Sequence, residues 1–358
     1  MKAAVAYGPG EPLRVENLEL PAVGPRDVLV RLSASGICHT DLTVIDGRSA
    51  LPLPMVPGHE GCGVVEQVGA EVRRVAVGDR VVASVSPACG TCWWCRNGTS
   101  QHCELKPVVS STPRYKLPDG RMAPALCGCG TFAEAMVVDE ASVIAVETDL
   151  VDEQLALLGC GVTTGLGAAL ITAGVTPGAS VAVIGCGAVG QSVVQGAGIA
   201  GAATIIAVDL AEGRRAASLE VGATHAVDPA DGDPVEQVRA LTNGRGVDFS
   251  FEVVGFPELM LQAVAMARTA GVVTFVGMPA KDAELTLPAV GAIFSGKRIQ
   301  GSVVGGAQVL RDIPRFILLA ESGRLDLGSL VSRRIVLEDI NDGIELLRQA
   351  DGVRTVIV

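Results

Sequence analysis

Four cysteines in one short segment are the clearest chemical signal in this sequence of 358 residues. Two residues separate Cys89 from Cys92 and Cys92 from Cys95, and seven residues separate Cys95 from Cys103. One loop with this spacing can surround a single Zn²⁺ with four thiolates and leave no coordination position open, which is typical of structural zinc sites. The sequence therefore predicts a structural zinc lobe over residues 89–103.

A framework of disulfides is the alternative use for the ten cysteines of the chain. The first residues contain no long apolar segment behind a basic start, so they are not typical of a secretory signal. A chain of this length can also build hydrophobic cores without covalent cross-links. Because the repeated C-x-x-C spacing favours metal binding, we expect reduced thiols and a cytoplasmic protein.

Three further residues could bind a second metal ion. Cys38 lies in the segment Ser35–Asp41, His59 follows Gly58, and Cys160 lies between two glycines. Taken singly, either cysteine could be an ordinary buried thiol, and His59 could be an ordinary turn histidine. Three such ligands on one ion would keep a fourth position open, which is typical of catalytic zinc.

A glycine motif follows the apolar run 180–185, with Gly185, Gly187 and Gly190 in Gly-x-Gly-x-x-Gly spacing. The motif alone is weak in a chain with 44 glycines, but a helix-like stretch follows it and Asp209 ends the next apolar run. In this frame the glycines allow a tight turn and the approach of a pyrophosphate to a helix N-terminus. Asp209 would bind the adenosine ribose and repel a 2′-phosphate, which favours NAD over NADP. The alternative for Asp209 is an ordinary turn aspartate.

The chain changes character near residue 160, from short β-like stretches to strands that alternate with glycine turns and helices. After residue 300 the pattern becomes mixed. It predicts an α/β fold in which a doubly wound parallel sheet is inserted into a β-rich domain, with domain bounds at 1–160, 161–300 and 301–358. The expected buried strands of the inserted sheet are 180–185, 204–208, 247–254 and 271–276, followed later by a helix near 343–349 and a strand at 354–358.

Charge and hydropathy limit the partners of the protein. The 39 acidic and 28 basic residues give a net charge of −11, so the sequence carries no basic footprint for a nucleic acid. No apolar run approaches the ~20 residues that a membrane span requires. We therefore expect a small-molecule substrate, and neither a nucleic acid nor a membrane as partner.

Together these motifs resemble the zinc-dependent alcohol dehydrogenases of the medium-chain dehydrogenase/reductase superfamily. The resemblance runs from Met1 to Val358 and is nearest to the longer-chain branch that includes the liver-type and the thiol-dependent formaldehyde dehydrogenases. Its strongest marks are the G-H-E-x₂-G-x₅-G-x₂-V stretch at 58–72, the cysteine lobe, and the GCGVTTG segment at 159–165. It implies a Rossmann-type domain inserted in a β-rich, GroES-like catalytic domain.

The resemblance also implies a catalytic site. Cys38, His59 and Cys160 would hold the catalytic zinc, with water or the substrate oxygen in the fourth position. Zinc would act as a Lewis acid on the alcohol oxygen, and a hydride would pass from the alcohol carbon to the nicotinamide.

Residues next to these ligands have implied roles as well. Thr40 stands where the family has a hydroxyl bonded to the alcohol oxygen, although it could be a plain helix-start hydroxyl. Asp41 would fix the second nitrogen of His59, and Glu60 would lie behind the zinc.

Two positions depart from the liver-type pattern. In liver-type enzymes the proton relay continues through the cofactor ribose to a histidine, which Thr43 replaces here. Either Thr43 and water would pass the proton on, or a solvent base would take it directly from the ribose. His39 replaces an arginine that faces the pyrophosphate, which predicts a weaker hold on NADH and faster release. The full set of implied cofactor contacts is His39, Thr164, Gly185, Gly187, Val189, Gly190, Asp209, Arg214, Val276 and Arg354.

By the same resemblance, Thr40, Val85, Leu126 and Met278 would line the alcohol pocket. Ethanol-preferring members have bulky aromatic residues at two of these positions, so we expect a wider pocket for medium-chain or aromatic primary alcohols. The segment 104–129 is expected to be a long loop that borders the pocket, and this branch of the family implies a homodimer.

Three alternatives remain open at this point. One is a formaldehyde dehydrogenase that needs mycothiol or glutathione, and another is a zinc-free quinone or enoyl reductase that uses NADPH. The third, from another class, is a non-catalytic protein that has kept the fold, as some lens crystallins have. A count of two zinc ions per subunit would distinguish a zinc enzyme from the zinc-free reductase and from the non-catalytic protein.

Overall fold

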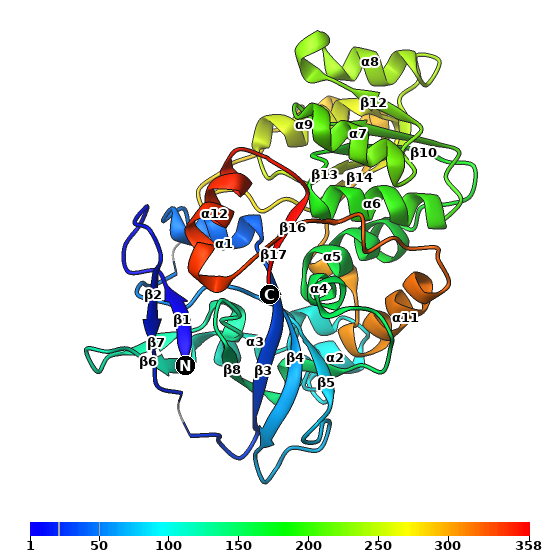
Figure 1. The fold of residues 1–358 in the computed structure, drawn as a ribbon. Coiled ribbons are helices and arrows are strands. Elements are labelled where there is room, and N and C mark those ends of the chain that lie inside the picture. Colours follow the sequence, from blue (N-terminus) through cyan, green and yellow to red (C-terminus); the bar gives the residue numbers. More distant parts are fainter. Residues whose placement is uncertain (21, 50) are drawn as a thin grey trace. The chain divides into compact units, whose positions relative to one another are not determined.

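The computed structural model describes residues 1–20, 22–49 and 51–358. The chain divides into two compact units, each with its own large sheet (Figure 1). The first unit comprises Met1–Thr163, Ala307–Gly323 and Val331–Val358, and the second comprises Thr164–Gly306 and Arg324–Leu330. The second unit is thus inserted in the sequence of the first, and the end of the chain completes the first.

A mostly antiparallel sheet forms the frame of the first unit. Its strands lie in the order β16-β17-β3-β4-β5-β9, with β8 also paired to β3. The last strand of the chain, β17, pairs with β3, so the red strand β17 lies beside the blue strand β3 in Figure 1. The strands are β3 (Asp27–Gly36), β4 (Glu60–Val68), β5 (Arg80–Ala83), β8 (Ala135–Asp139), β9 (Val143–Ala145), β16 (Val331–Ile335) and β17 (Arg354–Ile357).

Alternate residues in the first part of β3 contribute to the core, because successive side chains of a strand point to opposite faces. Val28 and Val30 of β3 pack with Val65 of β4 and with Met136 and Val138 of β8. The other elements of the unit are β1 (Lys2–Val5), β2 (Arg14–Asn17), α1 (His39–Ile45), α2 (Trp93–Arg96), α3 (Lys106–Ser111), β6 (Pro113–Lys116), β7 (Met122–Pro124), α4 (Asp152–Ala156), α11 (Val309–Glu321), α12 (Ile340–Arg348), and 3₁₀ helices at Ser100–His102, Leu126–Gly128, Glu140–Ser142, Leu157–Gly159 and Leu337–Asp339.

The segment 104–129 is not the long loop that the sequence predicted. It contains α3 and the hairpin of β6 and β7, whose strands are joined across a Pro-Asp-Gly turn. Tyr115 anchors the hairpin, because its ring is fully buried and its hydroxyl donates to the carbonyl of Gly130 at 2.8 Å. The Pro-Asp-Gly sequence therefore marks the turn of a hairpin.

The second unit contains a parallel sheet of six strands in the order β12-β11-β10-β13-β14-β15. Successive residues of β10 and β11 are buried on both faces, as continuous apolar runs predict for a parallel sheet. The predicted fold class is confirmed. The strands are β10 (Ser180–Ile184), β11 (Thr204–Val208), β12 (His225–Val227), β13 (Val247–Glu252), β14 (Ala267–Phe275) and β15 (Arg298–Gly301).

Helices cover both faces of this sheet. One core contains Val183, Phe251 and Val193 of α6, and the opposite core contains Ile206 and Met266 of α9. The helices are α5 (Gly161–Gly167, which crosses the boundary between the units), a π-helix at Ala168–Ala173, α6 (Ala188–Ile199), α7 (Glu212–Glu220), α8 (Pro234–Ala240), α9 (Pro257–Met266), α10 (Ala289–Ser295), and 3₁₀ helices at Pro229–Asp231 and Val304–Gly306.

The strand order reverses between β10 and β13, which makes the carboxyl ends of these strands the switch point of the sheet. Open α/β sheets bind ligands in the crevice at this point. The glycine motif follows β10 directly, so the fold places it at the expected edge.

All ten cysteines are described, and none of them forms a disulfide. In the described part of the chain, no single helix is both long and apolar enough to cross a membrane. One bent pair of helices, Asp152–Gly159 with Gly161–Ala173, meets the same criteria of length and composition, with an angle of 59° between its halves.

Candidate functional site

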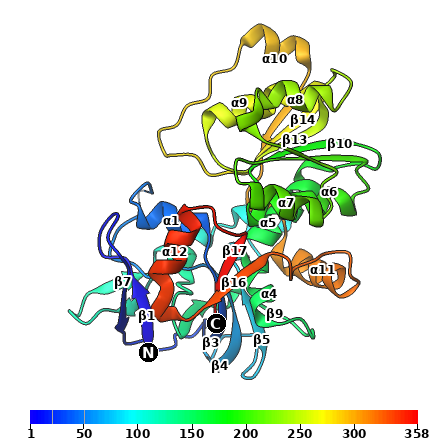
Figure 2. The ribbon, with the colours of Figure 1, turned by 45° about the horizontal axis from the view of Figure 1, so that its top comes forward.

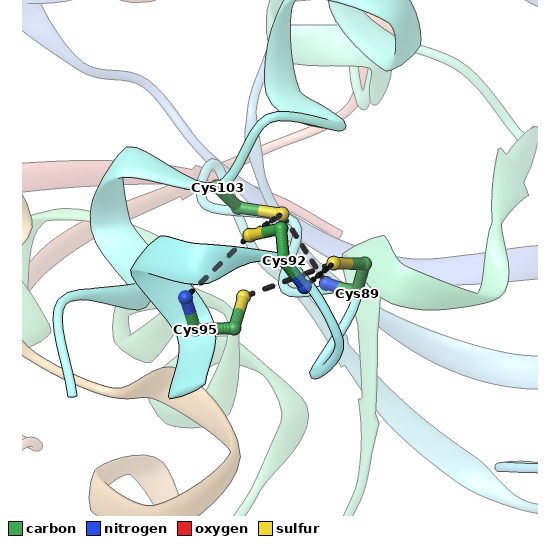
Figure 3. Close-up of side chains that lie close together, drawn as sticks. All are labelled: Cys89, Cys92, Cys95 and Cys103. Carbon is green, nitrogen blue, oxygen red and sulfur yellow. Dashed lines mark hydrogen bonds between the residues drawn. The ribbon is translucent and has the colours of Figure 1, made fainter. Parts of the chain in front are cut away.

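The four lobe cysteines lie together in the first unit (Figure 3). Their sulfur atoms all lie within 4.8 Å of one another. Cys92 caps the short helix α2, and its Sγ accepts a hydrogen bond from the backbone of Cys95 at 3.5 Å. The sequence spacing therefore produces a compact cluster of four sulfur atoms.

Backbone amides point toward these sulfur atoms. The Sγ of Cys89 accepts from the amides of Thr91 and Cys92, and the Sγ of Cys103 accepts from the amides of Cys89 and Leu105, at 3.3–3.4 Å. Burial disfavours the Cys89 thiolate, but the hydrogen bonds from Thr91 and Cys92 outweigh it and lower the pKa of this thiol to about 6. Donors that stabilise thiolates fit a four-cysteine zinc site.

A second cluster brings together Cys38, His59, Glu60 and Cys160, whose ligand atoms also lie within 4.8 Å of one another. Cys38 precedes α1, Glu60 begins β4 with His59 directly before it, and Cys160 lies between a 3₁₀ helix and α5. Segments that are far apart in the sequence thus converge at one buried place in the first unit.

Asp41 connects two of these segments. One carboxylate oxygen lies 3.0 Å from Nδ1 of His59 and accepts from the amide of Gly58 at 2.8 Å. The other oxygen accepts from the amide of Cys38 at 2.9 Å. The carboxylate therefore fixes the imidazole of His59 and the backbone at Cys38 and Gly58.

The other imidazole nitrogen, Nε2 of His59, is buried and has no hydrogen-bond partner among the described residues. A buried polar atom without a partner is costly, so its presence needs an explanation. The neighbouring sulfur atoms of Cys38 and Cys160 suggest one, because two thiolates and an imidazole are a zinc ligand set. A hydrogen bond from Cys160 also holds the pKa of Cys38 well below the usual range of a thiol.

Glu60 and Arg354 form a buried ion pair beside the ligands. The Nη2 of Arg354 lies 3.1 Å from Oε1 of Glu60, and its Nη1 donates to the carbonyl of Ile37 at 2.7 Å. The amide of Gly161 donates to the same Glu60 oxygen at 3.0 Å. Burial raises the pKa of Glu60 to about 7, although the Arg354 charge opposes the rise. A methyl group on Gly161 would lie only 2.6 Å from Arg354, which explains a glycine after Cys160.

These contacts of Arg354 differ from the phosphate contact that the family resemblance implies for it. Both terminal nitrogens of its side chain bind within the first unit, and Nε is buried without a partner in the described part of the chain. Contact of Arg354 with a cofactor phosphate stays a prediction.

The remaining residues of the predicted catalytic region lie in several environments. The hydroxyl of Thr40 lies 3.9 Å from Sγ of Cys38, and the hydroxyl of Thr43 donates to the carbonyl of His39 at 2.9 Å. Val85 and Leu126 are buried in the first unit, whereas Met278 belongs to the second unit and is exposed, so their shared pocket stays a prediction.

In the second unit, each glycine of the motif meets a different requirement. Gly185 has a positive φ of 93°, and a methyl group on Gly190 would lie 1.8 Å from the carbonyl oxygen of Gly185. Gly187 caps α6 and faces open space, since the nearest atom to a methyl group there would be a nitrogen of Arg214 at 3.9 Å. A tight turn with an open backbone at a helix N-terminus fits a pyrophosphate.

Asp209 lies next to this turn. Its carboxylate accepts from the amides of Cys186 at 2.7 Å and Ala211 at 2.8 Å. Val189 and Val276 are half-buried at the carboxyl edge of the same sheet, and Thr164 is half-buried in α5.

Two features of the second unit were not predicted from the sequence. Glu252 ends β13 and accepts from the amides of Val254 and Gly255 at 2.8 and 2.6 Å, and its position at a strand end was the only signal. Arg215 and Asp228 form an ion pair behind Asp209, and no local pattern links residues so far apart.

Two family models match this chain. The alcohol dehydrogenase GroES-like domain matches residues 24–148, and the zinc-binding dehydrogenase domain matches residues 188–320. The NDMA-dependent alcohol dehydrogenase of Amycolatopsis methanolica is 37% identical, over 100% of this chain and 98% of that protein. The chain belongs to the zinc-dependent alcohol dehydrogenase family of the medium-chain dehydrogenase/reductase superfamily. The predicted family is confirmed, and the protein is an alcohol dehydrogenase.

Solved structures agree with this assignment. An alcohol dehydrogenase zinc-binding domain protein from Burkholderia ambifaria is 35% identical with a TM-score of 0.93, covering 99% of this chain and 98% of that one. The benzyl alcohol dehydrogenase of Acinetobacter calcoaceticus is 32% identical with a TM-score of 0.92, with the same coverage.

Removing one ligand from each cluster should have different consequences. We expect Cys38→Ala and Cys92→Ala each to lower the zinc content from about two to about one per subunit, measured by mass spectrometry. Cys92→Ala should also lower the melting temperature by roughly 10 °C, because closed sites contribute folding energy. Cys38→Ala should stay folded but lose activity. Cys62→Ala, a buried cysteine outside both clusters, is the control and should keep both ions. Unchanged zinc in either ligand variant would contradict the assignment.

Proposed function

We propose that the protein oxidises primary alcohols to aldehydes, reversibly, with NAD as hydride acceptor and two zinc ions per subunit. The observation that carries the proposal is the buried cluster of Cys38, His59 and Cys160, in which Nε2 of His59 has no partner among the described residues. The four-cysteine lobe supports a second, structural zinc.

Zinc held by these ligands supplies a Lewis acid that makes the alcohol hydroxyl more acidic. The protein's own residues do the rest. Asp41 holds the imidazole of His59 so that Nε2 faces the cluster. Thr40, whose hydroxyl lies beside Cys38, accepts the proton of the alcohol and passes it on. The buried pair of Glu60 and Arg354 holds the backbone next to Cys38 and Cys160 in place.

The further path of the proton favours solvent over Thr43. The Thr43 hydroxyl already donates to the carbonyl of His39, so a relay through it would have to break that bond. Transfer from Thr40 to a solvent base needs no such rearrangement. We therefore propose direct exit of the proton to solvent.

NAD is the proposed acceptor because Asp209 lies at the end of β11, next to the glycine turn. The relative from Amycolatopsis is named for dependence on NDMA. The deciding assay therefore measures alcohol oxidation with NAD, NADP or NDMA as acceptor, and with formaldehyde plus glutathione or mycothiol as substrate. Turnover of simple alcohols with NAD supports the proposal. Turnover of only a thiol adduct would replace it with the thiol-dependent reaction.

We also propose a homodimer formed through the second unit. A long connection, residues 276–288, leads from β14 to α10 (Figure 2). On α10, Val290, Ile293 and Phe294 are 70%, 75% and 82% exposed. The neighbouring strand β15 is the edge of the sheet, so its outer backbone groups are free to pair with a second copy.

Charged side chains on α10 should prevent this association. We expect Ile293→Glu with Phe294→Glu to give a monomer by light scattering, because burial of two carboxylates in an apolar contact is unfavourable. Leu318→Glu, at an exposed position of α11, is the control and should leave the mass unchanged. A wild-type monomer would contradict the proposal.

Cofactor choice should depend on Asp209. Asp209→Gly removes the carboxylate that repels a 2′-phosphate, and we expect kcat/KM for NADP to rise about ten-fold or more relative to NAD. The comparison of both cofactors at a fixed alcohol concentration measures the change. Equal use of NAD and NADP by the wild type would show that the residue does not select the cofactor.

Substrate preference should follow the size of Val85 and Leu126. Each methylene buried in an apolar pocket contributes at most ~0.8 kcal/mol, so hexanol should exceed ethanol in kcat/KM by roughly two to three orders of magnitude. Benzyl alcohol should also exceed ethanol. Val85→Phe combined with Leu126→Phe should shift the preference toward ethanol. If the wild type uses ethanol as well as hexanol and benzyl alcohol, the pocket is not wide.

A further inference from the structure

The turn that carries Asp209 is held from behind by one side chain. Arg215 lies in α7, and its Nη1 donates to the carbonyl oxygens of both Asp209 and Leu210 at 2.8 Å. Its side chain is only 16% exposed. The guanidinium therefore holds two consecutive backbone carbonyls, those of Asp209 and Leu210, in the turn after β11.

The other end of the guanidinium is fixed as well. Its Nη2 lies 2.6 Å from Oδ2 of Asp228, which follows β12. The second oxygen of Asp228 accepts from the amide of Ala230 at 2.9 Å. Arg215 thus connects the turn after β11 to the turn after β12, and Asp228 balances its charge.

The Asp209 carboxylate depends on this backbone for its direction. Among the described residues, one oxygen accepts from the amide of Cys186 and the other from the amide of Ala211. A carboxylate offers about four acceptor positions, which is more than these two amides occupy. The bond to Ala211 lies within the same short turn whose carbonyls Arg215 holds. A shift of this turn would turn the remaining acceptor positions away from a ligand.

We propose that Arg215 is a positioning residue for the adenosine ribose of the dinucleotide and acts through the Asp209 carboxylate. The inference rests on the proposed function, because it requires a dinucleotide at this edge of the sheet. Since Asp228 balances the charge of Arg215, the guanidinium adds no net attraction for a 2′-phosphate. Arg215 therefore orients Asp209 without weakening its preference for NAD.

The test compares Arg215→Met with Arg239→Met. The control residue also pairs with a carboxylate, Glu236, and donates to a backbone carbonyl, that of Ala265, but it lies on α8. We expect Arg215→Met to raise KM for NAD and Kd for ADP-ribose about ten-fold, with kcat at saturating NAD and the melting temperature unchanged. Arg239→Met should leave all four unchanged. Arg215→Lys keeps the positive charge but loses the planar guanidinium that reaches both turns, so its effect should be intermediate.

A double-mutant cycle decides whether the effect passes through Asp209. In an Asp209→Ala background, Arg215→Met should weaken ADP-ribose binding less than two-fold further. Additive losses, or a fall in melting temperature and kcat together with binding, would overturn the inference and leave Arg215 a structural residue. If the wild type binds ADP-ribose no more tightly than the Arg215→Met variant, this inference fails but the proposed function still stands. Wild-type protein that binds neither NADH nor ADP-ribose would overturn the proposed function and this inference with it.

Discussion

The buried ion pair of Arg354 and Glu60 is the interaction on which the cluster of Cys38, His59 and Cys160 depends. Both side chains are almost completely withdrawn from solvent, at 3% and 0% exposure. Removal of two charges from water costs several kcal/mol per ion unless further hydrogen bonds satisfy them. Here the carbonyl of Ile37 and the amide of Gly161 supply two such bonds, whereas Nε of Arg354 and Oε2 of Glu60 are buried without a partner among the described residues. Ile37 and Gly161 are the neighbours of Cys38 and Cys160, so the pair fixes the backbone beside both cysteines.

This pair also explains why the chain must return to the first unit after building the second. Arg354 begins β17, and β17 pairs with β3, the strand that leads into Cys38. Glu60 of the cluster therefore gains its buried partner only when the last strand has joined the sheet. A local segment could not supply the same charge at the same buried position, because every neighbour of Glu60 in the sequence is part of the cluster or of β4.

The two cysteine clusters differ in how they are held. The lobe is formed by fifteen consecutive residues, 89–103, and its sulfur atoms receive hydrogen bonds from their own loop. The cluster of Cys38, His59, Glu60 and Cys160 draws on three distant segments and is fixed by Asp41 and by the ion pair of Glu60 with Arg354. A locally held cluster suits a structural ion, whereas a cluster held by distant segments can keep one side free for a substrate.

Spacing in the sequence was enough to predict the lobe, the glycine turn and the alternation of strands and helices, because each depends on residues that are close along the chain. Resemblance to a family supplied the grouping of Cys38, His59 and Cys160, which spacing alone left open. The tertiary structure decided three other features. It showed a hairpin in place of the loop at 104–129, it paired Arg354 with Glu60, and it placed Arg215 behind Asp209. The pairing of Arg354 with Glu60 joins residues 294 positions apart in the sequence, and local periodicity carries no information about such a contact. The hairpin and the Arg215 contacts join residues that are nearer in the sequence, but they depend on particular side chains, Tyr115 and Arg215, that periodicity does not single out.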